Sequence, residues 1–531
     1  MRAMARGARG VLSLVAIAWL VGVPDAGILA GRMGPTAGTE FRSGVTALHN
    51  FEYEEANAAF LRAQQLDRDF ALAYWGEAMT YHQILWQNED AAAGRRALLR
   101  LAPTPAARAA KAASDRDRGF LSAADALFGS GDAVARRAAH ARAMADVYER
   151  MPGDPDVAAF YALALLGTMA RGLAGAADAH EGHSAALAGS TTQARVTAIL
   201  EQVLRAHPNH PGALHYLLHN NDDPAHARVA LPAARAYAKV APASSHALHM
   251  PAHIFVQLGM WNDAAQSDRA AYSASDAWVK AKRLPPAMRS YHALSWLQYA
   301  LLQLGRHAEA RETLAQIEPV VKATGELRLV SELASMRARY VIDTGRWDLM
   351  AREQNFGNVN ELFAIGISAA RTGNLGAAQL ARQALAERAG APQEGDMRPV
   401  IAIMEKQVGA LIELAAGRRD RAVEILRAAM EAEQRLPAPL GPPKPVKPAA
   451  ELLGDILLEI GRPRDAIAPF QIALGRNANR TLSVLGLARA TRAAGDITAS
   501  LAQYRALLVN YARADAGLPA LDEARAALKR K

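Results

Sequence analysis

A period of 34 residues is the feature that most constrains the fold of this chain. Two glycines near the C-terminus lie 34 positions apart, and each is followed by a small residue five positions later and an aromatic residue nine positions later. These two sets are Gly461, Ala466 and Phe470, and then Gly495, Ser500 and Tyr504. A fixed period of this length indicates a repeat array. The 531 residues also exceed the size at which one hydrophobic core keeps growing, so we expect a row of similar units.

The spacing of these glycines, small residues and aromatics resembles the tetratricopeptide repeat. That resemblance implies a pair of antiparallel helices in each repeat, with glycine in the turn, and an all-α, right-handed superhelical solenoid for the chain. The composition agrees, because alanine, leucine and arginine are abundant and aromatic residues make up only 6%. The resemblance covers most of residues 37–515 and is degenerate between about residues 90 and 200. Its clearest further copies are residues 37–70, 211–244, 245–278 and 291–324.

The first thirty residues have the pattern of a secretory signal. Three arginines precede an apolar run, Val11 to Val23, which is too short to span a bilayer. Cleavage after Ala26 or Ala30 fits the requirement for small residues. Because residues 1–30 carry three arginines and one aspartate, their removal lowers the net charge from +9 to +7. The chain contains no cysteine, which excludes a lipoprotein anchor, so we expect a periplasmic or secreted protein with no membrane anchor after cleavage.

A proline-rich stretch divides the rest of the chain. Residues 437–448 read PAPLGPPKPVKP, and proline both lacks an amide donor and clashes with the preceding helical turn. We therefore predict a stiff linker at 437–449 between a main array, 31–436, and a C-terminal repeat pair with its tail, 450–531. The positive charge is mild for this length and forms no block with interleaved aromatic residues, so nucleic acid is not an expected partner.

Histidines are concentrated in one part of the chain. Eight of the fifteen fall between His207 and His253, far more than an even distribution would place there. In the frame of the repeats, histidines recur at positions 2, 5 and 9, and one carboxylate falls at position 12. These residues are His215, His219 and Asp222 in the repeat that begins at Pro211, His246, His249 and His253 in the next, and His292 in the one after.

Positions 2, 5, 9 and 12 form one stripe along an α-helix, because each residue advances the helix by 100°. The resemblance to tetratricopeptide repeats implies that this stripe lines the concave groove in which ligands bind. Residues 207–292 would then bring six imidazoles and a carboxylate to one part of the groove, on helices whose axes lie about 8–10 Å apart. One alternative stays open, since a helix that begins at Pro251 would leave His249 outside the stripe.

The chemistry that suits such a cluster is metal binding. Neutral imidazole binds copper, zinc and iron well, and without cysteine a thiolate site is excluded. We predict a transition-metal site for copper, zinc or iron. The number of donor residues is sufficient for one ion or for two adjacent ions. If one ion is bound, the ring nitrogens of His215, His219, His249 and His253 should converge to within about 3–5 Å. The predicted ligands are His215, His219, His246, His249, His253, His292 and Asp222.

Six further residues are candidates for supporting roles. Metal-bound histidines require partners that orient their rings, and residues beside the cluster can supply them. An aromatic residue and a histidine nearer the N-terminus also fall on the groove side of their helix. These six residues are Tyr216, Asp223, Tyr291, Tyr299, Trp75 and His82. The segment HEGH at 180–183 is one residue shorter than a zinc-protease motif, and we interpret it as a loop.

The segments HPGALHYLLH and HALHMPAHIFVQLG also resemble a group of bacterial tetratricopeptide proteins with a histidine-rich core and without a settled activity. That resemblance supports the site and implies no reaction. We expect the metal to serve catalysis or the metal-dependent binding of a peptide or small molecule in the groove. The alternative is a metal-free scaffold for protein–protein interaction, and a further alternative is storage or delivery of metal.

Overall fold

The computed structural model describes residues 35–86, 88–169, 191–353 and 357–529. The predicted signal segment 1–30 and the HEGH segment at 180–183 lie outside these residues. Within the described ranges, no helix combines the length and the apolar character needed to cross a membrane.

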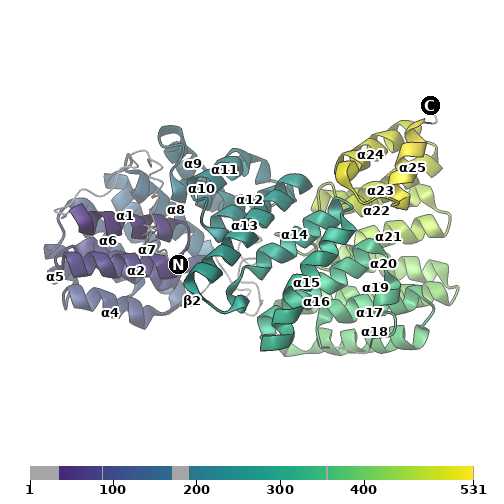
Figure 1. Ribbon diagram of the computed structural model, residues 1–531, viewed down its shortest axis with the longest axis horizontal. Coiled ribbons are helices and arrows are strands. Elements are labelled where there is room, and N and C mark those ends of the chain that lie inside the picture. The colour runs from purple at the N-terminus through teal and green to yellow at the C-terminus, as the bar shows by residue number, and fades with distance from the viewer. Residues whose placement is uncertain (1–34, 87, 170–190, 354–356, 530–531) are drawn as a thin grey trace, which may run out of the picture.

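Helices make up nearly all of the described chain (Figure 1). The N-terminal part contains α1 (Pro35–His49), α2 (Tyr53–Leu66), α3 (Ala71–Thr80), α4 (Ala91–Leu101), α5 (Pro105–Ala110), α6 (Asp115–Leu127), α7 (Ala133–Arg150) and α8 (Pro155–Met169). The middle part contains α9 (Thr191–Ala206), α10 (Pro211–Asn220), α11 (Ala227–Val240), α12 (Ser245–Gln257), α13 (Trp261–Lys282), α14 (Tyr291–Gln303), α15 (His307–Thr324) and α16 (Leu327–Thr344). The C-terminal part contains α17 (Val359–Arg371), α18 (Leu375–Gly390), α19 (Arg398–Ala415), α20 (Arg419–Gln434), α21 (Ala449–Glu459), α22 (Pro463–Arg476), α23 (Thr481–Ala494), α24 (Ile497–Asn510) and α25 (Pro519–Lys529). Two short strands, β1 (His82–Gln83) and β2 (Asn88–Glu89), pair antiparallel after α3.

Consecutive helices pack on one another along the array, and Figure 1 shows α18, α17, α19, α20 and α21 stacked one above another on the right of the view. Helices joined by turns of a few residues run antiparallel. The first helix of one pair also contacts the first helix of the next pair. Examples are the contacts of α10 with α12, of α14 with α16 and of α21 with α23. The all-α tetratricopeptide-repeat solenoid predicted from the period is therefore confirmed.

The 34-residue period has a steric explanation. Gly461 and Gly495 have φ values of +78° and +93°, a left-handed conformation that ends a helix and that side chains disfavour. Phe470 projects from α22 against Gly454 of α21 and Gly486 of α23. A Cβ added at those two glycines would lie 2.7 and 2.2 Å from its ring. The aromatic residue of the period therefore packs directly on the backbone of two first helices.

The C-terminal repeats fold back onto the middle of the array. The side-chain amide of Asn479 donates to the carbonyl of Gly259 at 2.9 Å, across 220 residues of sequence. Thr481 donates its hydroxyl to the carbonyl of Gln303 at 2.6 Å and its backbone N–H to the Gln303 side chain at 3.0 Å, across 178 residues. The turns that follow α12 and α14 are thus held by the segment that precedes α23.

A buried arginine lies between these two contacts. Arg480 donates to Asp343 of α16 at 2.6 Å and to Glu451 of α21 at 2.9 Å, and its side chain is 0% exposed. A charge removed from water in this way is tolerated only with partners of opposite charge. Arg480 therefore joins the start of α23 to two helices that are distant in sequence.

Residues 437–448, which we call the strap, connect α20 to α21 and contain no helix, as their prolines predict. From Leu440 onward nearly all of the strap is buried. The amide of Gln257 donates to the carbonyl of Pro439 at 2.9 Å, and that of Gln407 donates to the carbonyl of Lys447 at 2.8 Å. Because α20 and α21 also contact each other, the helices on the two sides of the predicted linker pack together.

The Arg480→Ala substitution should lower the free energy of unfolding by about 3–5 kcal/mol, because it leaves two buried carboxylates without the guanidinium between them. Denaturant unfolding of the whole chain, followed by helical circular dichroism, measures this change. Arg421 is the matched control, since its ion pair with Glu424 is exposed, and Arg421→Ala should leave the unfolding transition nearly unchanged. Equal effects of the two substitutions would show that Arg480 does not hold the C-terminal repeats in place.

Candidate metal centre

The predicted histidines lie on three first helices, α10, α12 and α14. Each helix begins after a residue whose side chain accepts a hydrogen bond from a backbone N–H of the first turn, His210 before α10, Ser244 before α12 and Ser290 before α14. Such caps satisfy amide groups that have no partner within the helix. The caps fix where each helix starts, and so which face its histidines occupy.

Pro251 lies inside α12 and does not begin it. The helix runs from Ser245 to Gln257, so His246 and His249 precede the proline on the same helix. The alternative start at Pro251 is therefore wrong, and the predicted stripe is continuous.

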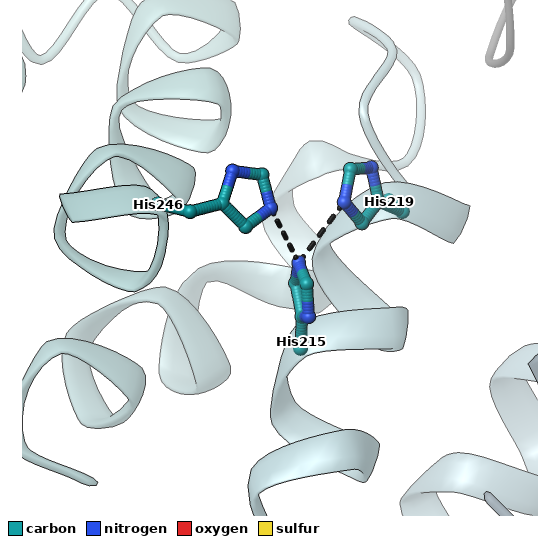
Figure 2. Close-up of side chains that lie close together, drawn as sticks. All are labelled: His215, His219 and His246. Atoms are coloured by element: carbon teal, nitrogen blue, oxygen red, sulfur yellow. Dashed lines mark hydrogen bonds between the residues drawn. The ribbon is translucent and has the colours of Figure 1, made fainter. Parts of the chain in front are cut away.

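The first triad consists of His215 and His219 from α10 and His246 from the first turn of α12. Figure 2 shows the three rings directed toward one another. The Nε2 atom of His215 lies 3.0 Å from Nε2 of His246 and 3.1 Å from Nε2 of His219. His215 and His219 are buried, whereas His246 is half-buried.

The second triad consists of His249 and His253 from α12 and His292 from the first turn of α14. The Nε2 atoms of His249 and His253 lie 3.0 Å apart. The ring of His292 lies 4.8 Å from that of His249, centre to centre, and ring nitrogens of all three residues lie within 4.8 Å of one another. As in the first triad, the two residues from one helix are buried and the third is half-buried.

The two triads are copies of one arrangement. In each, two histidines four residues apart on one helix meet the histidine at the second position of the next first helix. Residues four apart lie on the same helical face, which explains the close pair. The sequence left open one site, with four converging ring nitrogens, or two adjacent sites, and the structure gathers the six histidines into two groups of three.

The opposite ring nitrogens, Nδ1, have oxygen partners. His215 donates Nδ1–H to the main-chain carbonyl of His49 at 2.6 Å. Nδ1 of His253 lies 2.7 Å from Oδ2 of Asp222, and Nδ1 of His249 lies 2.5 Å from Oδ1 of Asp268. These bonds fix the ring orientations and direct Nε2 into each triad. Asp222, which we predicted as a ligand, lies beside the outer nitrogen of the His253 ring, on the side away from the triad.

The electrostatic environment keeps the central imidazole neutral. Burial lowers the pKa of His215 to about 3, and charges on His49 and His253 act in the same direction against the hydrogen bond from His215 to the His49 carbonyl. His246 of the first triad and His249 of the second lie three residues apart on α12, so the two triads are close neighbours. A neutral imidazole is the form that binds a metal ion.

An aromatic ring covers each triad. The ring of Phe51 lies 4.3 Å from that of His215, and it also contacts His219 and His246. Trp296 of α14 lies 4.3 Å from His253 and also contacts His249 and His292. Phe51 has a φ of +59°, a strained conformation for a bulky residue that persists only where the surroundings impose it.

A third group of titratable residues supports the first triad from behind. Asp156 of α8 lies 3.2 Å from Nε2 of His210 and 3.4 Å from Nε2 of His49, and its other oxygen accepts from Arg116 at 3.1 Å. Burial alone would raise the pKa of Asp156, but the hydrogen bonds from His210 and His49 hold it well below its usual range. Because Nδ1 of His210 accepts from a backbone N–H, its Nε2 carries the proton that Asp156 accepts. Both oxygens of this carboxylate are therefore engaged in hydrogen bonds, and Oδ1 holds His49 in place.

Of the predicted supporting residues, Tyr216 lies beside the first triad, whereas Asp223 and Tyr291 bond to residues outside both triads. Tyr216 donates its hydroxyl to Nδ1 of His49 at 2.9 Å, so it reaches the first triad through His49. Asp223 contacts His226 at 2.8 Å and accepts from the first amides of the segment that leads into α11. Tyr291 donates to the carbonyl of Pro286 at 3.3 Å.

The other three predicted residues belong to different packing groups. Tyr299 lies between Trp261 and Arg339, with its ring 5.4 Å from the indole. Trp75 packs on the rings of Phe120 and Phe160. His82 of β1 lies 3.4 Å from Glu89 of β2, which holds the short hairpin together. The groove position alone does not indicate contact with the histidines.

Several residues of the site were missed from the sequence. Asp268 comes from α13 and His49 and Phe51 from the first turn of the array, and neither segment shares the histidine periodicity. Trp296 carried a signal, because it lies four residues after His292 on the same helical face. The contact between α1 and α10 that brings His49 to His215 joins residues 166 positions apart, which periodicity does not encode.

No protein-family model matches the chain, and no curated protein sequence matches it. Among the solved structures with some similarity are tetratricopeptide-repeat proteins. One such protein from Parabacteroides merdae is 14% identical with a TM-score of 0.30, over 54% of this chain and 97% of its own. Yeast Tom70 is 13% identical with a TM-score of 0.28, over 93% and 96%, and a human IFIT1 dimer is 12% identical with a TM-score of 0.35, over 90% and 95%. Similarities this distant carry no argument about function.

The Gly441→Ala substitution should destabilise the fold by about 1–3 kcal/mol, because an added Cβ would lie 2.2 Å from the Trp296 ring and overpack the cover of the second triad. Thermal unfolding of the full chain measures the change. Gly475→Ala is the control, since no atom lies within 4 Å of a Cβ added in that part of α22. If Gly441→Ala left the transition as unaffected as the control, the strap would not be packed on Trp296.

Proposed function

We propose that this protein binds two transition-metal ions in its groove, one in each histidine triad. The observation that carries the proposal is the convergence of ring nitrogens in both triads while Nδ1 atoms of His215, His249 and His253 face oxygen partners. Metal-bound histidines have this arrangement, since one ring nitrogen binds the ion and the other donates to an oxygen that fixes the ring.

The spacing of the donor atoms supports this proposal. Zinc lies about 2.0–2.1 Å from imidazole nitrogen, so two nitrogens at a tetrahedral angle are separated by about 3.3 Å. The Nε2 separations of 3.0–3.1 Å differ from that value by a few tenths of an ångström. The remaining nitrogen separations in each triad are at most 4.8 Å, so the rings would have to move closer together to hold an ion at the centre.

The composition of the triads favours particular metals. All six donors are imidazole nitrogens, which suit zinc and copper better than the oxygen-seeking ions magnesium, calcium and manganese. Zinc would act as a Lewis acid and activate water, and copper would add electron transfer. Three protein donors leave a fourth coordination position open, as in catalytic metal sites, whereas structural zinc sites use four.

Access to the second triad supports catalysis over simple storage. A cavity of about 240 Å³ borders His292 and Trp296, and it is lined further by Ser295, Ser331 and Pro442 of the strap. Such a cavity gives a small polar molecule a route to the edge of the site. We therefore place metal-dependent catalysis on a small molecule ahead of metal storage or delivery.

The second candidate function is binding of a polypeptide partner. The strap already packs beside the second triad, which limits the space there for another extended chain. A larger cavity of about 590 Å³ lies beside α16, α17 and α21, lined by apolar Trp347 and Leu452 and by charged Arg371 and Asp455. A partner that binds this cavity should bind equally well to chains with and without metal.

Metal-free protein reloaded with zinc or copper should hold two ions per chain by elemental analysis after removal of excess metal. His215→Ala and His249→Ala should each reduce this to one ion, because each removes the central donor of one triad. His226→Ala is the control, since this half-exposed histidine pairs with Asp223 outside both triads. Protein that binds neither zinc nor copper in this assay would overturn the proposal.

We further propose that the chain is exported and that residues 1–30 are removed. The arginines and the apolar run of this segment support the proposal. The mass of protein recovered from the periplasm or medium should correspond to a chain that begins at Gly27 or Gly31. Full-length mass in the cytoplasm would contradict it.

A further inference from the structure

The two triads differ in the groups that support them. In the second triad, both histidines of α12 have carboxyl partners at Nδ1, Asp268 for His249 and Asp222 for His253. In the first triad, the central His215 has a neutral partner, the main-chain carbonyl of His49. The two positions are therefore chemically different although their donors are the same.

The two carboxyl groups are firmly held. Asp268 lies on α13, packed against α12, and its side chain is 0% exposed. Asp222 lies in the turn after α10 and also accepts from the amide of Gln257 at 3.2 Å, one helical turn beyond His253. Because neither carboxyl group is exposed to water, each keeps its hydrogen bond to the Nδ1 atom of its histidine.

A carboxyl partner strengthens an imidazole as a metal ligand. A hydrogen bond to a charged acceptor is about twice as strong as one to a neutral carbonyl. It raises the basicity of the opposite ring nitrogen, and loss of such partners typically weakens metal binding by about 10–100-fold. Negative charge next to a buried divalent ion also offsets the unfavourable burial of that ion.

We infer that the second triad, His249, His253 and His292, is the high-affinity metal position. Asp222 and Asp268 raise its affinity for the metal ion. The first triad is the position that binds its ion more weakly and exchanges it more readily. This inference rests on the proposed function, because it assigns an order to the two ions. The tightly bound ion would therefore lie next to the cavity that borders His292. The more weakly bound ion would lie in the first triad.

The test is a titration of the metal-free full chain with cobalt(II) in competition with a chelator, followed by the visible absorption of the bound ion. Two steps are expected, with affinities at least about 10-fold apart. His249→Ala should remove the tight step, and His215→Ala should remove the weak step. Two steps of equal affinity, or loss of the tight step in His215→Ala, would overturn the inference and leave the proposed function intact. No binding at either position would overturn the proposed function itself.

The positioning role of the carboxylates is tested by graded substitutions. Asp268→Asn keeps an acceptor but cannot carry a negative charge when an ion binds, so it should weaken the tight step by about 10-fold or more and shift its cobalt absorption band. Asp268→Ala should weaken this step further, by up to about 100-fold, while the weak step stays unchanged in both variants. Asp222→Asn repeats the test at His253 for the case that Asp268→Ala does not fold.

The matched control is Asp276→Asn on the same helix, α13. Asp276 pairs with Arg289 and Lys280 and lies outside both triads, so its loss should leave both steps and the absorption band unchanged. Unchanged tight affinity and spectrum in Asp268→Asn, Asp268→Ala and Asp222→Asn would show that the carboxylates only fill space, which contradicts the inference.

Discussion

The candidate metal centre depends on the close packing of successive first helices. The 34-residue period returns the chain to the same orientation one helix further along, so His249 and His253 repeat the positions of His215 and His219. In the C-terminal repeats, Gly454 and Gly486 show how glycine lets neighbouring helices approach, because both pack on the Phe470 ring of α22. Each triad needs two helices at this distance, because two of its donors come from one helix and the third from the next.

The fold and the identity of the histidines could be predicted from the sequence, since both follow from a period. The stripe of positions 2, 5 and 9 placed all six histidines on one side of three helices. The division into two triads was not predictable in the same way. It depends on the second position of each helix pointing back to the preceding one, which requires the angle between helices and the rotamers of six rings.

The supporting residues were harder to predict, and the reason is physical. Asp268 reaches His249 from a second helix, and His49 reaches His215 from a turn 166 residues away. Such contacts depend on tertiary packing and leave no periodic trace. The reverse error occurred for Tyr299 and Trp75, where a groove position suggested a contact, but the large rings instead pack on neighbouring aromatic residues.

The return of the C-terminal repeats changes what kind of solenoid this is. An open array can extend and bend along its length, because each unit contacts only its neighbours. Here Asn479 and Thr481 donate hydrogen bonds to the carbonyls of Gly259 and Gln303. These two residues lie at or just after the C-terminal ends of α12 and α14, two of the three helices that carry the histidines. The array cannot stretch at the triads without breaking these contacts. In the proposed metal sites, a rigid frame of this kind would impose its own coordination geometry on an incoming ion, and the discrimination between metals would then reside partly in contacts made far from any donor atom.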